Sequence, residues 1–303
     1  MATSQRTIFV IGSSNTDMVV KSPRIPMPGE TILGGEFMVF QGGKGANQAV
    51  AASRLGGSVT FVTSLGSDSF GDEALKGFQR EGMDITFVTR HPSAATGVAL
   101  ISVDDQGRNS IVVAPGANAK LGAKEAINAL ESTRESKIIL MQLEIPMDTI
   151  EKILKESSTG DIRILNPAPA AKIPLHWYPR IQIITPNETE ASLLTGINVI
   201  DLKSATKSAE WFHEQGVQIV VITLGEKGAF VSDGKSRWMT ASPQVHAIDS
   251  TAAGDCFNGA LAVALAENKN LETAVQWACE AASISVTRMG AQVSMPLRKE
   301  LKP

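Results

Sequence analysis

Near the carboxyl end of the chain, a polar turn that contains glycine precedes an apolar helical stretch; its sequence is Asp-Ser-Thr-Ala-Ala-Gly-Asp-Cys-Phe-Asn-Gly over residues 249–259. At the start of a helix the backbone N–H groups of Ala252, Ala253 and Gly254 lack partners within the helix, and the helix dipole favours an anion there. Asp255 follows directly, and its carboxylate would accept the proton of an attacking hydroxyl while the N–H groups hold charge on a transferring phosphoryl group. For this segment alone, a helix cap with a tight turn is the competing interpretation.

Two further polar, glycine-containing segments stand where a strand ends or a helix begins. Residues 12–17 (Gly-Ser-Ser-Asn-Thr-Asp) follow the first apolar run, and residues 42–48 (Gly-Gly-Lys-Gly-Ala-Asn-Gln) lead into a helix. Lys44 is followed by Gly45 where a Walker loop needs Ser or Thr, and the chain has no G-x-G-x-x-G, so a P-loop ATPase and a dinucleotide enzyme are both disfavoured. Close backbone packing is the alternative for the second segment. Because all three polar turns stand at strand or helix ends, we expect them to line one crevice.

Short apolar runs alternate with helical patterns along the chain. Such runs are typical of parallel strands buried on both faces, and they predict strands at 8–11, 59–62, 138–143, 162–165, 181–184 and 219–224. The patterns between them end near glycine and predict helices at 46–55, 148–156 and 204–215. The alternation predicts an α/β fold with a mostly parallel central sheet, helices on both of its faces, and a ligand crevice at the carboxyl ends of the strands.

Two β-rich stretches interrupt this alternation. Residues 17–40 carry several prolines and glycines among β-formers, and residues 98–113 alternate apolar and polar side chains around a hairpin signal at Asp104–Gly107. A sheet of so few strands cannot cover both of its own faces. We therefore expect a single domain over residues 1–303, with a small β-sheet lid at about 17–40 and 96–115.

Composition narrows the class of partner. The 303 residues are 43% hydrophobic and 19% charged, with 28 basic and 31 acidic side chains, so no basic field attracts nucleic acid or an anionic membrane. Cys256 and Cys279 are too few for a disulfide framework and lack zinc-site spacing, and the polar segment 1–7 followed by a short apolar run does not resemble a signal peptide. A small-molecule partner and a cytoplasmic location are the expectation.

These segments together resemble the ribokinase/phosphofructokinase B family of carbohydrate kinases, and within it the ribokinase branch. The match spans nearly the whole chain and is carried, in order, by residues 12–17, 42–49, 140–144, 166–170, 185–191, 223–228, 249–259 and 287–292. The resemblance implies a ribokinase-like three-layer α/β/α sandwich. It also implies ATP-dependent phosphorylation of D-ribose at O5, with Asp255 as general base and the 252–255 turn as anion hole. A kinase acting on 2-deoxyribose, another pentose or a nucleoside is the alternative, and a non-catalytic sugar sensor is disfavoured because Asp255 and Gly254 are intact.

The resemblance also assigns binding residues. The sugar would contact Asn15, Thr16, Asp17, Gly43, Lys44, Gly45, Ala46, Asn47, Glu144 and Asp255. The nucleotide would contact Asn187, Thr223, Leu224, Gly225, Glu226, Lys227, Gly228, Gly254 and Cys279. Taken singly, a cap or turn explains Asn15, Asp17 and Glu144, and a solvated charge explains Lys227.

Two metal ions and a second copy of the chain complete what the resemblance implies. Glu190 would help to organise Mg²⁺ through water, whereas a solvated helix face is its ordinary explanation. A potassium ion would lie at Asp249, Thr251, Ser285, Arg288, Gly290 and Ser294, several of them acting through backbone carbonyls. Cys279 stands where many relatives have Asn or His near the adenine. Cys256 stands where Thr is usual, and we expect this difference to affect packing. A homodimer through the β lid is the expected assembly.

Overall fold

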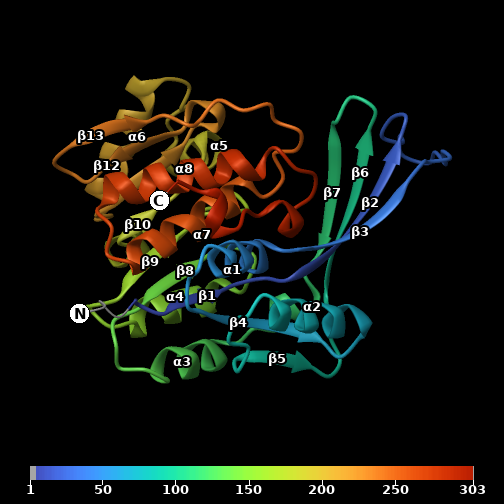
Figure 1. Ribbon diagram of the computed structural model, residues 1–303, viewed down its shortest axis with the longest axis horizontal. Helices are drawn as coiled ribbons and strands as arrows, with labels where there is room; N and C mark the ends of the chain where they lie inside the picture. The colour runs from blue at the N-terminus through green and yellow to red at the C-terminus, as the bar shows by residue number, and fades with distance from the viewer. Residues whose placement is uncertain (1–4, 303) are drawn as a thin grey trace.

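The central feature of the computed structural model, which describes residues 5–302, is a nine-stranded sheet in the order β13-β12-β11-β10-β9-β8-β1-β4-β5 (Figure 1). All neighbours are parallel except the pairs that β12 makes with β11 and β13. The strands are β1 (Ile8–Ile11), β4 (Val59–Gly66), β5 (Val88–His91), β8 (Ile138–Met141), β9 (Ile162–Leu165), β10 (Ile183–Ile184), β11 (Ile219–Thr223), β12 (Ala229–Ser232) and β13 (Arg237–Thr240).

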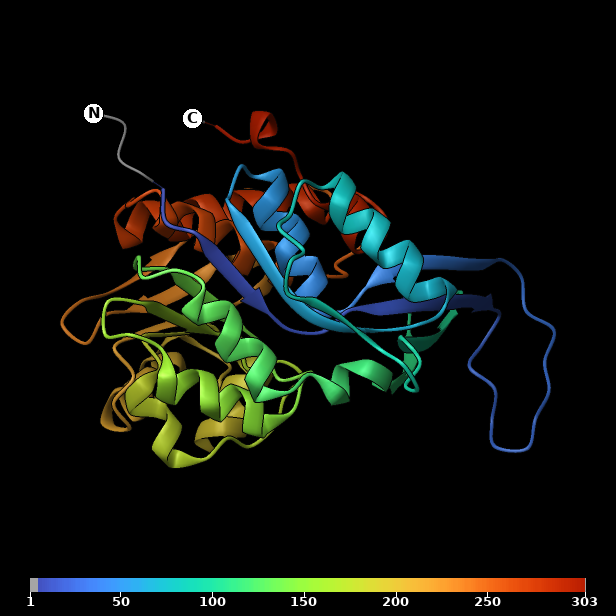
Figure 2. The ribbon, with the colours of Figure 1, turned by 90° about the horizontal axis from the view of Figure 1, so that it is seen from below.

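Helices cover both faces of this sheet. Figure 2 shows the blue, cyan and red helices α1 (Lys44–Arg54), α2 (Ser69–Arg80), α7 (Ala253–Ala266) and α8 (Leu271–Ser285) above it, and the green and olive helices α3 (Ala123–Glu131), α4 (Met147–Glu156), α5 (Glu188–Thr195) and α6 (Leu202–Glu214) below it. Short 3₁₀ helices lie at Gly116–Lys120, Leu175–Arg180, Gly225–Lys227, Gln292–Ser294 and Arg298–Glu300. Because side chains alternate along a strand, Ile8 and Val10 pack into one helical layer, and Phe9 and Ile11 pack into the other. The predicted three-layer α/β fold is confirmed.

Strand order reverses between β1 and β8. From β1 the chain moves to β4 and β5 on one side, then crosses back to β8 and continues outward on the other side. Loops leaving such a switch point diverge, so a crevice opens at the carboxyl ends of these strands. The turns after β1 and β8 therefore form the two sides of that crevice.

A second, four-stranded sheet stands beside the main body, at the right of Figure 1. Its order is β3-β2-β6-β7, with β2 (Asn15–Ser22), β3 (Phe37–Gly42), β6 (Gly97–Asp104) and β7 (Asn109–Ala114). Asp17 pairs with Phe40 and Ala99, and these side chains share the face that turns toward the crevice. A hollow of about 270 Å³ separates that face from Asp249 and Gly290.

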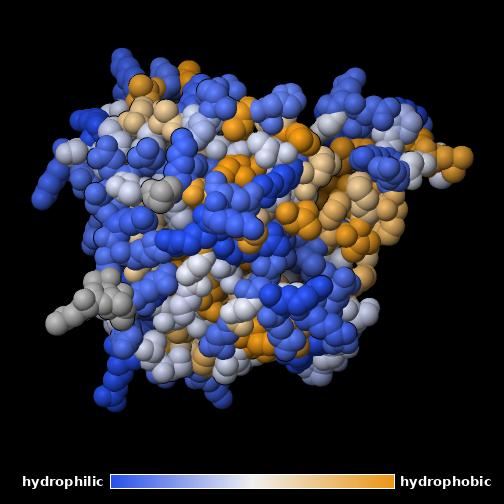
Figure 3. Space-filling model, in the orientation of Figure 1, coloured by the Kyte–Doolittle hydropathy of each residue, from blue (hydrophilic) through white to orange (hydrophobic). Residues whose placement is uncertain are grey.

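The opposite face of the small sheet is apolar and exposed. Val20, Phe37, Val39, Leu100 and Val112 lie there with 39–66% of their surface accessible. In the view of Figure 3, hydrophobic residues gather over this sheet at the right, whereas the visible face of the main body is more polar.

The predicted elements match with local differences. The strand predicted at 181–184 shortens to Ile183–Ile184, and the turn predicted at 12–17 ends sooner because Asn15 already begins β2. The antiparallel hairpin β12–β13 was not predicted, although Asp233-Gly234 is a hairpin signal and Asp233 Oδ1 accepts the N–H groups of Lys235 and Ser236. Across residues 5–302, the helices are all too short or too polar to cross a bilayer; the first part of the polar segment 1–7, residues 1–4, lies outside the described range.

Candidate active site

Asp255 lies at the start of α7 with 6% of its surface exposed. Two side-chain amides of α1 hold its carboxylate: Asn47 Nδ2 donates to Oδ2 and Gln48 Nε2 donates to Oδ1, each at 2.9 Å. Burial raises the pKa of Asp255, and the charge of Lys44 with these two hydrogen bonds opposes the rise. The carboxylate is therefore oriented and still able to accept a proton.

Glycines let the start of α1 approach the turn after β1. A Cβ at Gly45 would lie 2.5 Å from the carbonyl carbon of Gly12, and a Cβ at Gly43, whose φ is 87°, would lie 2.6 Å from the Asn15 nitrogen. Side chains at either position would push the helix away. In the close arrangement Ala46 N–H donates to the Ser13 carbonyl oxygen at 2.8 Å. Gly45 and Ala46 thus lie against the turn after β1, and the close backbone packing considered for this segment is present.

Charged groups from four elements surround Lys44. Burial lowers the pKa of this ammonium group, but the carboxylates of Asp255, Glu144, Glu190 and Asp17 raise it above its ordinary value. Glu144, just after β8, accepts the Ser13 hydroxyl at 2.5 Å and the Lys44 N–H at 3.1 Å. Lys44 therefore stays protonated as the positive charge of an otherwise acidic site.

Asp17 is a second perturbed carboxyl group. Burial, aided by the negative charges of Glu144 and Asp255, raises its pKa from 3.8 to about 6 against the opposing charge of Lys44. Asn15, two residues earlier on the same face of β2, accepts from Asn118 Nδ2 at 2.7 Å. The Thr16 side chain is fully buried and points to the opposite face of β2. The pleat of β2 therefore separates it from the side chains of Asn15 and Asp17, with which it was expected to bind sugar.

The turn before α7 has the backbone of an anion cradle. Ala252 adopts the left-handed conformation with φ 59°, and a Cβ added at Gly254 would meet nothing within 4 Å. Within residues 5–302, the N–H groups of Ala252 and Gly254 have no hydrogen-bond partner, whereas Ala253 N–H donates to Ser250 at 3.2 Å. Two of the three donors that were expected, Ala252 and Gly254, are therefore free in this conformation. They open on a hollow of about 180 Å³ that is also lined by Lys44, Asn166, Thr185, Asn187, Glu190, Thr223, Asp255 and Asn258.

Asn187 and Glu190 form a capping box at the start of α5. Asn187 Oδ1 accepts the Glu190 N–H at 2.8 Å, and Glu190 Oε2 accepts the Asn187 N–H at 2.9 Å. Glu190 is 8% exposed, so a solvated helix face is not its explanation. Burial raises its pKa, opposed by the Asn187 N–H and by Lys44. Its Oε1 has no hydrogen-bond partner within the described chain and remains available beside the hollow.

The segment Thr223–Gly228 leaves β11 at the same edge of the sheet. Gly225, Glu226 and Lys227 form a 3₁₀ turn after Leu224, in which Lys227 N–H donates to the Leu224 carbonyl oxygen at 3.2 Å. Leu224 N–H in turn donates to the Gly228 carbonyl oxygen at 2.8 Å. Thr223 lines the hollow below Asp255. Cys279 does not line it; this residue of α8 is 3% exposed, packs in the apolar core, and has a thiol pKa that burial raises to about 12.

Three of the six residues expected to hold potassium, Asp249, Thr251 and Gly290, are joined by hydrogen bonds. Asp249 accepts the Thr251 N–H at 2.9 Å and the Gly290 N–H at 2.8 Å, and these bonds lower its pKa against the effect of burial. Arg288 N–H donates to the Ser285 carbonyl oxygen, and Ser294 is fully buried. Within residues 5–302, there is no cluster of three or more His, Cys, Asp and Glu side chains suited to a metal ion, so a cation here would rely on backbone and hydroxyl oxygens.

Several buried polar residues near Asp255 had received no role from sequence. They are Ser13, Gln48, Asn118, Gln142, Asn166, Thr185 and Asn258, each exposed by 6% or less. Most of them stand within the segments that carried the family resemblance, next to residues that were assigned. The available signal was an amide next to the run Ala49, Val50, Ala51 and Ala52 of a predicted helix, which is where Gln48 stands in α1.

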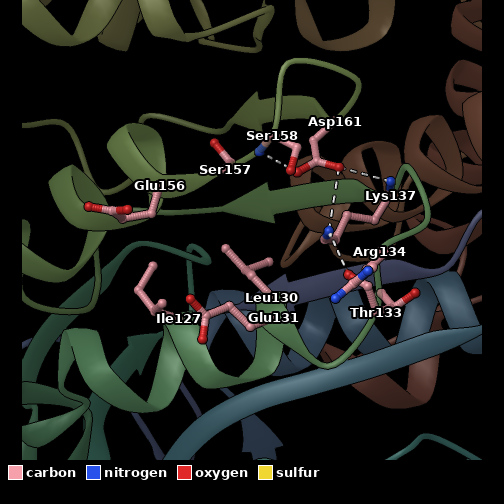
Figure 4. Close-up of a pocket in the computed structure, with 10 residues that line it drawn as sticks. All are labelled: Ile127, Leu130, Glu131, Thr133, Arg134, Lys137, Glu156, Ser157, Ser158 and Asp161. Carbon is pink, nitrogen blue, oxygen red and sulfur yellow. Dashed lines mark hydrogen bonds and ion pairs between the residues drawn. The ribbon is translucent and has the colours of Figure 1, made fainter.

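Another hollow, of about 300 Å³, lies at the opposite ends of the strands (Figure 4). Lys137 precedes β8 and Asp161 precedes β9; their charged groups are 3.6 Å apart and almost fully buried. Asp161 also accepts the N–H groups of Lys137 and Ser158. These bonds tie two loops together at the amino ends of the strands, away from the crevice.

Comparison with known proteins agrees with this geometry. A model of the pfkB family of carbohydrate kinases matches residues 5–298. The ribokinase of Haemophilus influenzae is 45% identical over 298 residues, which cover 98% of this chain and 97% of that protein. The crystal structure of a ribokinase from Thermotoga maritima is 40% identical with a TM-score of 0.89, and that of an Arabidopsis thaliana ribokinase complexed with ribose and ATP is 33% identical with a TM-score of 0.88; both comparisons cover 97% of each chain. The fold has a main sheet between two helical layers and a small second sheet, and the family model matches nearly the full length. The chain therefore belongs to the pfkB family of carbohydrate kinases.

Proposed function

We propose that this chain transfers the γ-phosphoryl group of ATP to O5 of D-ribose and releases D-ribose 5-phosphate. The observation that carries the proposal is a buried carboxylate, Asp255, beside the free N–H groups of Ala252 and Gly254 and facing Lys44. The similarity to ribokinases, one of them complexed with ribose and ATP, supports the choice of sugar and nucleotide.

Asp255 acts as general base on the terminal hydroxyl. The hydroxyl donates its hydrogen bond to the carboxylate, the oxygen attacks the γ-phosphorus, and the proton passes to Asp255 as the bond to the β-phosphate oxygen breaks. A raised pKa suits this role, because a carboxylate whose pKa lies nearer the working pH is a stronger base. Such proton transfer contributes roughly 10²–10⁴ in rate.

The turn of residues 252–255 stabilises charge on the transferring group. The N–H groups of Ala252 and Gly254 donate to its oxygens, with Ala253 as a third donor when its bond to Ser250 opens. Each such donor is worth roughly 10²–10³ in rate. The Lys44 ammonium group lines the same hollow and adds a positive charge.

The sugar is bound between β2, the start of α1 and Glu144 in the loop after β8. Asp17, Asn15 and Glu144 accept from its hydroxyls, and Gly43, Lys44 and Asn47 donate to them. A pentose that lacks one hydroxyl leaves a buried partner unpaired, which costs about 1–3 kcal/mol. This argument favours ribose over 2-deoxyribose.

ATP lies along residues 223–228 with its phosphates toward Asn187. The free Oε1 of Glu190 would accept a hydrogen bond from a water of a hydrated Mg²⁺ ion, and such an ion would supply positive charge to neutralise part of the charge of the phosphates. Cys279 is a buried wall of the adenine region in this proposal and makes no polar contact. A potassium ion behind the turn would be bound by one carboxylate together with carbonyl and hydroxyl oxygens. These oxygens come from Asp249, Thr251, Ser285, Arg288, Gly290 and Ser294.

We assign the small sheet two roles, as a lid over the sugar and as the contact in a homodimer. Its inner face carries Asp17 above the crevice, and its outer face carries exposed apolar side chains such as Phe37 and Val112. An apolar face of this kind favours burial against a second copy. The two buried, unbridged cysteines are compatible with work in a reducing cytoplasm.

A coupled kinase assay with ATP, magnesium and potassium across a panel of sugars tests the proposal. We expect D-ribose to have the highest kcat/KM, above 2-deoxyribose, other pentoses and nucleosides. A higher value for any of these replaces ribose as the substrate. Calorimetric binding of sugar and nucleotide without any phosphate transfer identifies a sensor instead.

A further inference from the structure

Gln48 is fully buried, and both the nitrogen and the oxygen of its side-chain amide are hydrogen-bonded. Its Nε2 donates to Asp255 Oδ1 at 2.9 Å and to Asn166 Oδ1 at 3.0 Å, and its Oε1 accepts from Gln142 Nε2 at 2.6 Å. A primary amide has two N–H donors, so both are consumed. The side chain has no donor left for a sugar or a nucleotide.

The partners of Gln48 fix which way its amide faces. Asp255 when ionised and Asn166 Oδ1 are both acceptors, so the nitrogen must point to them and the oxygen must point to Gln142. Asn166 is itself oriented, because its Nδ2 donates to the Thr185 carbonyl oxygen at 3.1 Å. Residues at the ends of β8 and β9 therefore dictate the orientation of an amide in α1.

The same bonds continue back to the anion turn. Thr185 Oγ1 donates to Asn258 Oδ1 at 2.7 Å, and Asn258 Nδ2 donates to the Gly254 carbonyl oxygen at 2.8 Å. Gly254 immediately precedes Asp255, so the hydrogen bonds close a ring through the base and the turn. Each side chain of this ring has a hydrogen-bond partner, whereas Gln142, which joins it only at Gln48, has Oε1 unpaired within the described chain. A buried ring that is paired in this way is rigid.

We propose that Gln48, fixed by Gln142 and Asn166, is the positioning residue for the base: it sets the orientation in which Asp255 presents its remaining lone pairs to the sugar hydroxyl. This inference rests on the proposed role of Asp255. Asn47 holds the other oxygen, Oδ2, but it also faces the sugar site. Gln48 is the partner whose only task is orientation, and misplacing a reacting group by about 1 Å costs up to roughly a hundredfold in rate.

Electrostatics gives the proposal a second readout. The charged groups facing Asp255 are Lys44 from α1, Glu144 after β8, Asp17 from β2 and Glu190 from α5. Burial raises the pKa of Asp255, and the Gln48 hydrogen bond opposes that rise. Without this donor the ionised form loses a partner, so the pKa rises further and the acid limb of the kcat profile moves to higher pH.

The test compares Gln48→Met, which keeps side-chain length and removes the amide, with Gln142→Met, which removes only the donor that fixes the amide. We expect kcat of Gln48→Met to fall roughly tenfold to a hundredfold with KM for ribose within about threefold of wild type, and its acid limb to move upward. Gln142→Met should fall less, and the double variant should match Gln48→Met because one residue acts through the other. Ser208→Ala is the matched control, since Ser208 is buried in α6 with no hydrogen-bond partner for its hydroxyl within the described chain.

Carbon-13 titration of the Asp255 carboxyl group in wild type and Gln48→Met gives a readout independent of turnover. A higher pKa in the variant supports the proposal; an unchanged pKa overturns it. Wild-type kcat in folded Gln48→Met, or losses that multiply in the double variant, also overturn it. A wild-type protein inactive on every sugar refutes the proposed function, whereas the titration still decides whether Gln48 holds the carboxylate.

Discussion

The side-chain nitrogen of Asn47 lies 2.9 Å from Oδ2 of Asp255, although 208 positions separate the two residues in the chain. Asn47 belongs to the first turn of α1, and Asp255 to the first turn of α7, and these two helices pack together on one face of the sheet. The helix start that we propose binds the sugar thus also holds the base. A shift of α1 moves both at once.

Replacing Asp255 with Asn should cut turnover at least about a hundredfold, because the amide cannot accept the proton of the sugar hydroxyl. The fold should persist and sugar affinity should change little. A coupled assay gives turnover, calorimetry gives affinity, and circular dichroism checks the fold. Near-normal turnover would eliminate Asp255 as the base.

Asp17→Asn should weaken sugar binding yet stabilise the protein above about pH 6. Below about pH 3, well under its ordinary pKa of 3.8, the Asp17 carboxyl group is protonated in both folded and unfolded chains and has no effect. Between its ordinary pKa of 3.8 and its folded pKa of about 6 the unfolded chain ionises first, so the wild type loses stability as pH rises. A shift of about two units corresponds to about 3 kcal/mol, which the variant should regain. Urea unfolding at about pH 4 and about pH 7.5 checks this, and a pH-independent difference would contradict it.

Adding ribose should slow amide hydrogen exchange in residues 17–40. Asp17 lies on the inner face of the small sheet, so sugar held by its carboxylate should draw β2 and β3 toward the crevice and reduce local opening. Mass-spectrometric exchange with and without sugar measures the effect, with the hairpin β12–β13 as an internal reference. Unchanged exchange in residues 17–40 would refute closure of a lid.

Val112→Lys should convert a dimer into monomers. Val112 is 66% exposed on the apolar outer face, in the edge strand β7, and a charge there opposes burial against a second copy. Sedimentation velocity should show a fall from a two-chain species to the single-chain mass of 32.1 kDa. Ile200→Lys is the control, because Ile200 is 71% exposed before α6, in the main body. A wild type that sediments as a monomer excludes the dimer.

Lys137→Met should destabilise the protein by about 3 kcal/mol, because it leaves the buried Asp161 carboxylate without its cation. Lys152→Met is the matched control; its ion pair with Glu156 is about half exposed, and its loss should cost less than about 1 kcal/mol. Urea unfolding measures both. Equal effects would show that burial does not strengthen the Lys137–Asp161 pair. Turnover per folded molecule should be unchanged, since the pair lies at the amino ends of the strands.

The sequence by itself determined the class of fold, the family and the segments that meet. Apolar runs such as Ile8–Ile11 read as buried strands because a parallel sheet is covered on both faces, and the glycine-rich segments read as ligand turns because they stand at strand or helix ends. Their types and order were enough to identify Asp255 as the candidate base. Local pattern could do this because each signal needs only neighbouring residues.

Only the tertiary structure decided which side chains touch. The pleat of β2 turns Thr16 away from Asn15 and Asp17, packing places Cys279 in the apolar core, and Ala253 N–H is engaged by Ser250. Gln48 in α1, Asn166 after β9 and Asn258 in α7 are far apart in the chain, and only the crossover at the switch point of the sheet brings their amides into one ring around Asp255, to which Gln142 is attached through Gln48. A hydrogen bond needs its two partners within about 3 Å of each other. The separation of two residues along a chain of alternating strands and helices does not reveal whether they come that close in space.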